Sequence, residues 1–347
     1  MPRTQAVSTA QVGAAPFFAG KNKIINGDFR INQRNFSSVT VAQYGFDRWL
    51  YDFSGGTVTY SAQTFTAGTA PVAGYEGTNF ARIVTASQST AGHFAYLGQC
   101  IEDVRTITNQ TVTVSFWAKA GSGTPNVGVT LAQNFGTGGS AEVPTSPAVQ
   151  AITTSWARYS FTLTLPSIAG KTIGANNKLF LYLFTSCGTT TSGAGYAAVG
   201  VQNATIDFWG VQVEAGSVAT AFQTATGTIQ GELAACQRYF QRYDSSSNAN
   251  TYYGLATANT STQPIMSFPL RVVMRTAPSF SASGANTHAF NFASGAAYVA
   301  SSLSLDTASP HTVGLYATTG SGMTLNACGR WLSYATTSSY LEFSSEL

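Results

Sequence analysis

The chain has 347 residues, of which 44% are hydrophobic and only 9% are charged. The formal net charge is +3 and no Lys/Arg run is present, which argues against a nucleic-acid or anionic-membrane partner. No stretch approaches the roughly 20 apolar residues of a membrane-spanning helix, and the N-terminus lacks the apolar region of a signal peptide. We therefore expect a soluble protein that is not exported by a signal peptide.

The polar residues are mainly Ser, Thr, Asn and Gln, accompanied by 34 glycines. This mixture favours short strands and tight turns and is poor in long-helix formers. The length exceeds the roughly 100–200 residues of a typical domain, so two domains are expected. The predicted fold class is all-β, with a jelly-roll-like antiparallel sandwich, a short connecting helix and a smaller C-terminal β domain.

The N-terminal part divides into an arm and a long strand-rich region. Residues 1–22 lack periodicity and are predicted to form an arm that is disordered or docked on a partner. Residues 23–228 are predicted to form the jelly-roll domain. Within it, residues 111–119 and 158–165 alternate apolar and polar side chains, which predicts two half-buried strands.

Two further segments of this region carry structural information. Residues 178–184 are apolar on both faces, as expected for a strand in the middle of the sandwich or beneath a neighbouring subunit. In residues 205–214 the apolar positions shift phase by one residue after Phe208. A β-bulge at Trp209-Gly210 would restore the alternation, since glycine commonly marks such sites.

A single helical pattern separates the two predicted domains. Leu233, Cys236 and Phe240 recur at three- and four-residue spacing, so residues 229–243 are predicted to form a connecting helix. Residues 244–347 are predicted to form the C-terminal β domain, whose lean core indicates either support from a partner subunit or a small sandwich with long loops. Its predicted strands cover residues 252–256, 264–268, 278–281, 312–316 and 339–343.

Several motifs together resemble a known class of proteins. Residues 23–29, 46–49, 112–119, 155–159 and 210–216 resemble the carbohydrate-binding-module-like jelly rolls of bacteriophage tail-fibre and minor virion structural proteins. Residues 232–241 (ELAACQRYFQ) are similar to the E-L-x-x-C-Q-R-Y-[YF] signature that follows this sandwich in phage tail proteins. Residues 268–278 and 344–347 are likewise similar to the C-terminal β module of those proteins.

The resemblance implies a virion component, made in the bacterial cytoplasm and assembled as a homotrimer. The N-terminal arm would contact other virion proteins, and the jelly roll would serve as scaffold or as a module for a host-surface glycan. The function expected is that of a tail fibre or tail-associated protein that contributes to host attachment. A purely structural head-decoration, head-fibre or collar protein is the main alternative, and a polysaccharide depolymerase is the second.

Catalysis is not expected. None of the three histidines, His93, His288 and His311, lies in a known catalytic motif. The only adjacent acidic pair is Glu102-Asp103, and neighbouring strand residues point to opposite faces, which makes a poor pair for glycoside hydrolysis. The four cysteines lie far apart without metal-ligand spacing and are predicted to be buried thiols.

Candidate ligand-binding residues are aromatic side chains expected in loops, because aromatic rings pack against the apolar faces of sugars. Trp49, Trp117, Trp156 and Trp209 are instead assigned to the core. The loop candidates are Tyr75, Phe135, Tyr196, Tyr252, Tyr253 and Trp331.

Two other kinds of site are predicted. Related jelly rolls hold a structural calcium ion, for which Asp28 and Asp207 could supply oxygen ligands. The alternative is that Asp28 belongs to a turn and that Asp207 is an outward strand residue. No other cofactor is expected. The predicted oligomer interface comprises Leu179, Leu181, Leu233 and Phe240.

Overall fold

The computed structural model describes residues 19–245, 248–292 and 297–347, and every statement of structure below refers to them. The chain forms two compact units. The sandwich unit comprises residues up to 30 together with 37–43 and 49–232. The barrel unit comprises residues 31–36, 44–48 and 233–347. The division falls between Glu232 and Leu233, and two short segments from the N-terminal part belong to the barrel unit. The predicted arm lies largely outside the described residues.

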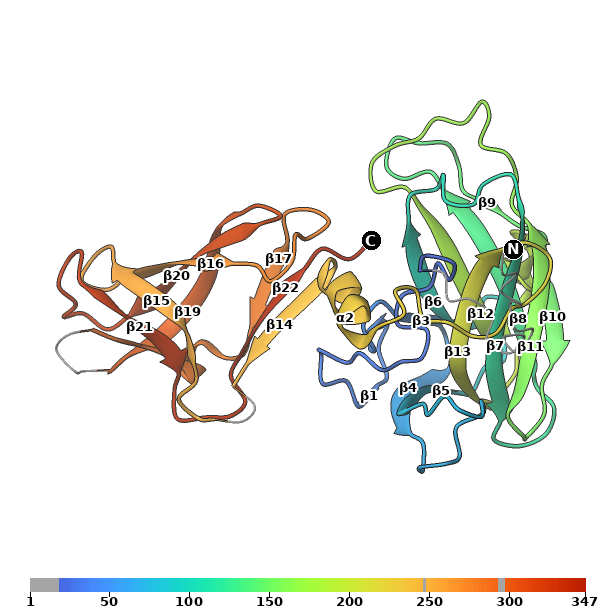
Figure 1. Cartoon of the computed structure of the whole chain (residues 1–347), viewed down its shortest axis with the longest axis horizontal. Helices are drawn as coiled ribbons and strands as arrows, with labels where there is room; N and C mark the ends of the chain where they lie inside the picture. The colour runs from blue at the N-terminus through green and yellow to red at the C-terminus, as the bar shows by residue number, and fades with distance from the viewer. Residues whose placement is uncertain (1–18, 246–247, 293–296) are drawn as a thin grey trace, which may run out of the picture. The chain divides into compact units, whose positions relative to one another are not determined.

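The sandwich unit consists of two antiparallel sheets (Figure 1). The six-stranded sheet has the order β1 (Ser38–Val39), β4 (Thr57–Thr64), β5 (Asn79–Ala86), β13 (Thr205–Ala215), β7 (Thr111–Ala120), β11 (Ala157–Thr164). The seven-stranded sheet has the order β10 (Ala148–Ala151), β8 (Asn126–Asn134), β12 (Lys178–Cys187), β6 (Phe94–Glu102), β3 (Leu50–Ser54), β2 (Gln43–Tyr44), with β9 (Val143–Pro144) paired to β8.

Strands β7 and β11 form where the alternation predicted them. Val112, Val114 and Phe116 of β7 are fully buried, and Phe161 of β11 lies opposite Val114 and is also buried. Intervening residues such as Thr162 are exposed. The prediction of a half-buried strand therefore holds for β11, whereas in β7 the intervening Thr113 and Ser115 are also buried, so the prediction of an exposed face is wrong there.

The predicted bulge in β13 is confirmed. The register of β13 against β7 shifts between Trp209 and Gln212. Gly210 has φ +63°, and a Cβ there would lie 2.7 Å from the Trp117 ring. Glycine is needed at this position because both the left-handed backbone and the close ring exclude a side chain.

The connecting helix is shorter than predicted. Helix α2 covers Ile229–Gln237, and β14 (Phe240–Asp244) follows, so the prediction of helix to Tyr243 is wrong. Phe240 pairs with Ser344 in a sheet, which satisfies its backbone groups outside the helix. Leu233 and Phe240 therefore do not share a helix face, and Phe240 is buried within its unit.

The barrel unit contains a small sheet and a closed barrel, all antiparallel. The sheet has the order β14, β22 (Tyr340–Ser344), β17 (Ser279–Ala282). The barrel has the order β15 (Tyr252–Ala258), β16 (Pro264–Pro269), β20 (Thr312–Thr319), β19 (Ala297–Ala308), β18 (His288–Asn291), β21 (Cys328–Ser333). Two short helices complete the described elements: α1 (Thr189–Gly193) in the sandwich unit and the 3-10 turn η1 (Ala285–Thr287) in the barrel unit.

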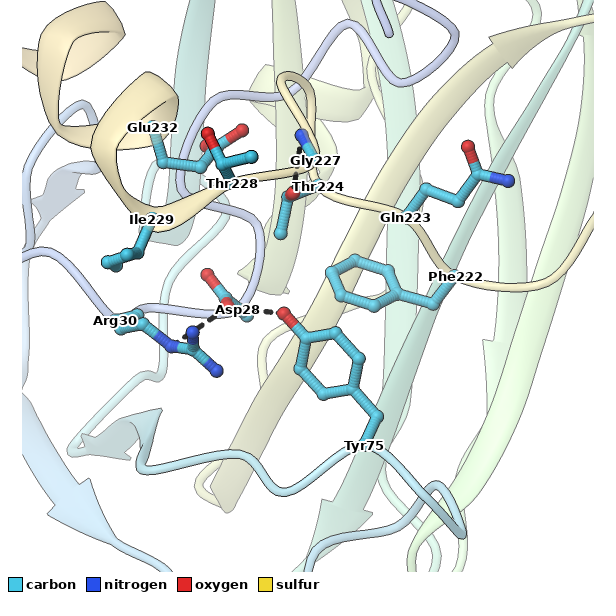
Figure 2. Close-up of a pocket in the computed structure, with 10 residues that line it drawn as sticks. All are labelled: Asp28, Arg30, Tyr75, Phe222, Gln223, Thr224, Gly227, Thr228, Ile229 and Glu232. Atoms are coloured by element: carbon cyan, nitrogen blue, oxygen red, sulfur yellow. Dashed lines mark hydrogen bonds and ion pairs between the residues drawn. The ribbon is translucent and has the colours of Figure 1, made fainter. Parts of the chain in front are cut away.

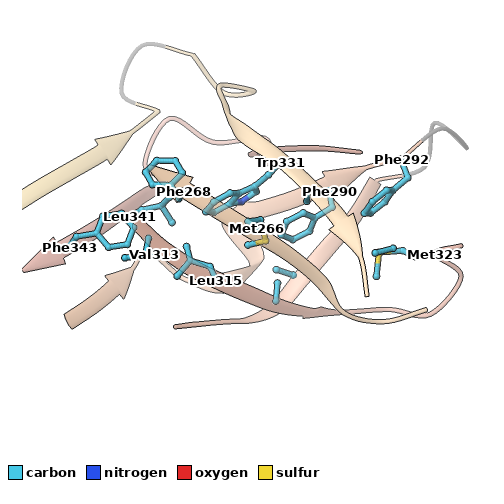
Figure 3. Close-up of a cluster of buried hydrophobic side chains, with 14 of the residues drawn as sticks. Met266, Phe268, Phe290, Phe292, Val313, Leu315, Met323, Trp331, Leu341 and Phe343 are labelled. Atoms are coloured by element: carbon cyan, nitrogen blue, oxygen red, sulfur yellow. The ribbon is translucent and has the colours of Figure 1, made fainter. Parts of the chain in front are cut away.

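The barrel has a core of its own (Figure 3). Phe268, Phe290 and Trp331 pack together with Met266 and Leu315 inside it. Cys328 lies on β21 and is exposed, which corrects the prediction that all four thiols are buried. No described helix has both the length and the apolar character needed to cross a bilayer.

Candidate functional site

The most distinctive surface lies on the seven-stranded sheet, on the face that points away from the sandwich core. On β12, Leu181 and Leu183 are fully buried in the core, so Tyr182 and Phe184 project from the opposite face. Strand β6 pairs with β12 so that Tyr96 lies opposite Phe184. Gly98 lies opposite Tyr182, and a Cβ there would come within 2.4 Å of the Phe180 ring.

The rings on this face stand at steep angles to one another. The ring centroids of Tyr96 and Tyr182 are 4.9 Å apart at 78°, and those of Tyr182 and Tyr196 are 5.2 Å apart at 76°. Phe184 stacks beside Tyr182 at 5.5 Å and 12°. We call the group the aromatic cage, defined as Phe94, Tyr96, Tyr182, Phe184 and Tyr196.

The cage encloses a cavity of about 210 Å³ that is also lined by Thr191. Phe184 is buried, because Ala197 and Val199 from the segment after α1 pack with it over one end of the sheet face. The other four rings of the cage are half-buried. The cage therefore has a closed end at Phe184 and partly exposed aromatic walls.

Two carboxylates flank the cage. Asp52 of β3 lies opposite Tyr96 and accepts a hydrogen bond from the Tyr96 hydroxyl at 2.9 Å. Glu142 accepts hydrogen bonds from the Tyr196 hydroxyl and from the Asn134 amide, the latter at 2.6 Å. Burial, followed by the contact with Glu142, raises the pKa of Tyr196 to about 12. The tyrosines are therefore neutral hydrogen-bond donors at physiological pH.

A second cavity, of about 310 Å³, lies where the first and last segments of the sandwich unit meet (Figure 2). Asp28 accepts a hydrogen bond from Tyr75 at 2.7 Å and pairs with Arg30 at 3.6 Å. Glu232 accepts hydrogen bonds from the backbone of Asn26 and Thr226 at 2.8 and 2.7 Å, and burial raises its pKa. These groups are engaged with one another, so we assign this cavity a structural role.

The two acidic residues considered for calcium do not form a common ligand set. Both carboxylate oxygens of Asp207 accept hydrogen bonds from Arg82, at 2.7 and 2.9 Å, whereas Asp28 contacts Tyr75 and Arg30. No group of three acidic, His or Cys side chains in the described part of the chain could hold a metal ion. Calcium prefers six to eight oxygen ligands, so these side chains do not fit it, and the calcium ion stays an untested prediction.

The predicted ligand-binding aromatics lie in different places. Tyr196 is part of the aromatic cage, and Tyr75 lies in the second cavity. Phe135 is 1% exposed and Trp331, on β21, is fully buried, so the expectation of exposed loop rings is wrong for both.

The remaining two predicted aromatics lie side by side in the sequence but differ in exposure. Tyr253 is half-buried against Trp331, with ring centroids 5.3 Å apart. Tyr252 is 58% exposed at the start of β15. Of these two, only Tyr252 offers a largely exposed ring.

Sequence reasoning missed four members of the cage because it looked for ligand-binding rings in loops, whereas these four lie in β6 and β12. The relevant signal was the segment 178–184, which is apolar on both faces. A β-strand that is apolar on both sides can bury only one face in a two-layer sandwich, so the second face needs a separate explanation.

The predicted interface residues also need correction. Leu179 and Leu181 are fully buried in the core of the sandwich, where a second subunit could not contact them. Leu233 is half-buried on α2. The apolar character of β12 is therefore explained within one chain, by the core on one side and by the cage on the other.

Comparison with known proteins gives one family match. Residues 21–176 match the family model described as a carbohydrate binding domain. The match includes Asp52, Tyr96 and Glu142, whereas Tyr182 and Tyr196 follow it in the sequence. A search of curated proteins found no significant match. This match covers less than half of the chain.

Solved structures resemble the chain at low identity. A CBM4 structure is 19% identical and covers 55% of this chain and 98% of that one, with a TM-score of 0.31. A xylan-binding domain from Paenibacillus barcinonensis is 15% identical over 59% of this chain and 100% of that one, with a TM-score of 0.32. The enzymatically active domain of bacteriophage CBA120 tailspike protein 4 is 13% identical. The match covers 56% of this chain and 22% of that one, with a TM-score of 0.33.

Proposed function

We propose that this protein binds glycans through the aromatic cage. The observation that carries the proposal is a cavity lined by half-buried aromatic rings, two of which donate hydrogen bonds from their hydroxyls to carboxylates. Aromatic faces pack against the apolar faces of sugar rings, and carboxylate oxygens accept hydrogen bonds from sugar hydroxyls. The family match to a carbohydrate binding domain supports the same role.

The test compares single Tyr-to-Ala variants of the full chain on a panel of immobilised polysaccharides. Tyr182→Ala and Tyr96→Ala are expected to weaken binding about tenfold or more through the loss of ring stacking. Tyr252→Ala is the matched control, because Tyr252 is 58% exposed in the barrel unit. Equal binding by all three variants would contradict the proposal.

We also propose that this binding attaches a bacteriophage tail fibre to its host, as a homotrimeric virion component. The support is the motif resemblance of residues 23–29 and 232–241. The first residue of the second motif, Glu232, lies in the sandwich unit, where it accepts a hydrogen bond from the backbone N–H of Asn26 at 2.8 Å. This contact gives a physical reason for both motifs to occur in one chain.

Adsorption of phage to host cells tests the attachment role. Purified protein should compete with phage for adsorption, and Tyr182→Ala should compete less well. Point variants are preferable to a truncation after Tyr243, because residues 31–36 and 44–48 belong to the barrel unit and would lose their partners. A well-folded protein that binds neither cells nor glycan would favour the structural head or collar role. Release of new reducing ends from the glycan would favour a depolymerase.

A further inference from the structure

We infer that the aromatic cage recognises a positively charged amino group on its ligand. This inference rests on the proposed glycan-binding function and specifies the chemical class of the glycan. The structural basis is the coincidence of a ring cage with two carboxylates that have no cationic partner among the residues the structure describes. The ligand would be a glycan with free amino sugars or with a quaternary ammonium substituent.

The first observation is the arrangement of the rings. Tyr96 and Tyr196 each stand at a steep angle to the stacked pair of Tyr182 and Phe184, with interplanar angles between 66° and 78°. The rings that line the cavity therefore lie in several different planes. The face of an aromatic ring attracts a cation within about 6 Å of its centroid, and several such faces form the cages that recognise quaternary ammonium groups.

The second observation is the unbalanced charge beside the cage. The hydrogen bonds to Asp52 come from Tyr96 and the Phe53 backbone, and those to Glu142 come from Tyr196 and Asn134. All four donors are neutral. No ion pair to Asp52 or Glu142 occurs in the described part of the chain, whereas Asp207 and Glu214 on the other sheet both pair with cations.

The third observation is the position of two basic residues on or beside the strands of the cage. Lys178 lies on the same sheet face with its Nζ 6.0 Å from the Phe180 ring centroid, and like Asp52 and Glu142 it is not among the residues that line the cavity. His93 precedes the cage residue Phe94, and its Nδ1 accepts a hydrogen bond from the Ser89 backbone. Of the described residues, none that lines the cavity is basic.

The size of the cavity limits what enters it. At about 210 Å³ it is smaller than the roughly 300–1,000 Å³ of pockets that hold drug-sized ligands. One sugar ring or one ammonium head group is therefore the unit recognised. A carboxylate- or sulfate-bearing sugar would be repelled by Asp52 and Glu142, whereas an ammonium group would compensate their charge.

The experiment measures binding of the full chain to chemically matched oligosaccharides by calorimetry at low salt. Chitosan oligomers carry free amines, chitin oligomers of equal length carry N-acetyl groups, and oligogalacturonates carry carboxylates. We expect about tenfold tighter binding of the amine than of the N-acetyl form, and no binding of the acidic form. Phosphocholine, tested alone and as competitor, distinguishes the quaternary ammonium source from the amino sugar source.

Variants of the carboxylates provide the internal control. Asp52→Asn and Glu142→Gln keep the size of the side chains and remove their charge, and each should weaken binding of the amine form several-fold more than binding of the N-acetyl form. Equal affinity for both forms, unaffected by these variants, would overturn the inference and leave the glycan-binding proposal standing. Failure of every ligand, including neutral polysaccharides, would overturn both.

Discussion

Arg48 is buried against the ring of Tyr239, with its guanidinium carbon 3.4 Å from the ring centroid, and it forms an ion pair with Glu346. The two partners of the ion pair are 298 residues apart in the sequence. Both belong to the barrel unit, together with Arg34, which also pairs with Glu346. Residues from the two ends of the chain therefore complete one folded unit.

The first prediction concerns this ion pair. Glu346→Ala should lower the free energy of unfolding of the barrel unit by about 3–5 kcal/mol, because it breaks the buried ion pair with Arg48. Urea denaturation monitored by tryptophan fluorescence measures the change. Asp103→Ala is the control, since Asp103 pairs with Arg105 at an exposed site and should cost no more than about 1 kcal/mol. Similar losses of unfolding free energy in both variants would contradict a stabilising role for the Arg48–Glu346 ion pair.

The second prediction separates the two faces of β12. Leu181→Ala should lower the free energy of unfolding by about 2–5 kcal/mol because it leaves a cavity in the core. Tyr182→Ala removes a half-buried ring from the opposite face and should cost less stability while weakening glycan binding. Paired denaturation and binding measurements check the difference. The two variants are compared under conditions where both are folded. If Leu181→Ala then loses as much glycan binding as Tyr182→Ala, the assignment of one face of β12 to the core and the other to the ligand is refuted.

The third prediction concerns the bulge in β13. Gly210→Ala should destabilise the sandwich unit by about 1–3 kcal/mol, because φ is +63° and the new Cβ would meet the Trp117 ring. Gly123→Ala is matched in backbone conformation, with φ +65°, but a Cβ there has no heavy atom within 4 Å. Thermal denaturation should show the smaller loss for Gly123→Ala. Equal losses of stability in the two variants would show that the contact with the Trp117 ring adds nothing to the cost of the left-handed backbone at Gly210.

The fourth prediction is a pH dependence of the barrel unit. Burial lowers the pKa of His288 from 6.5 to about 4, so the folded state holds the imidazole neutral. The unfolded state binds the proton more readily, so the contribution of His288 is complete above pH 6.5 and is lost as the pH falls towards 4. The full loss is about 3 kcal/mol. The free energy of unfolding of His288→Gln, measured between pH 6.5 and 4, should fall less steeply with pH than that of the parent protein. An identical pH dependence in the two proteins would contradict the prediction.

The sequence by itself determined the features that depend on neighbouring residues. The alternation in β7 and β11 identified their buried faces, since side chains in a strand point to opposite sides in turn. The phase shift after Phe208 located the bulge at Gly210. These features are local, so they are visible in a window of about ten residues.

Other features were decided only by the tertiary structure. The helix expected to reach Tyr243 ends at Gln237, because pairing with β22 draws the following residues into a sheet. Trp331 looked like a loop residue, yet it is at the centre of the barrel core. Strands β18, β19 and β21 were not predicted, since their Ala-, Ser- and Gly-containing segments become strands through their barrel neighbours.

The aromatic cage belongs to this second group. Tyr96, Tyr182 and Tyr196 come from three segments that meet only after β6 and β12 pair and the segment after α1 folds over them. The sequence indicated that β12 was apolar on both faces but not which side faced the core. Strand register and sandwich packing settled that choice, because they place Leu181 inside and leave Tyr182 beside the cavity.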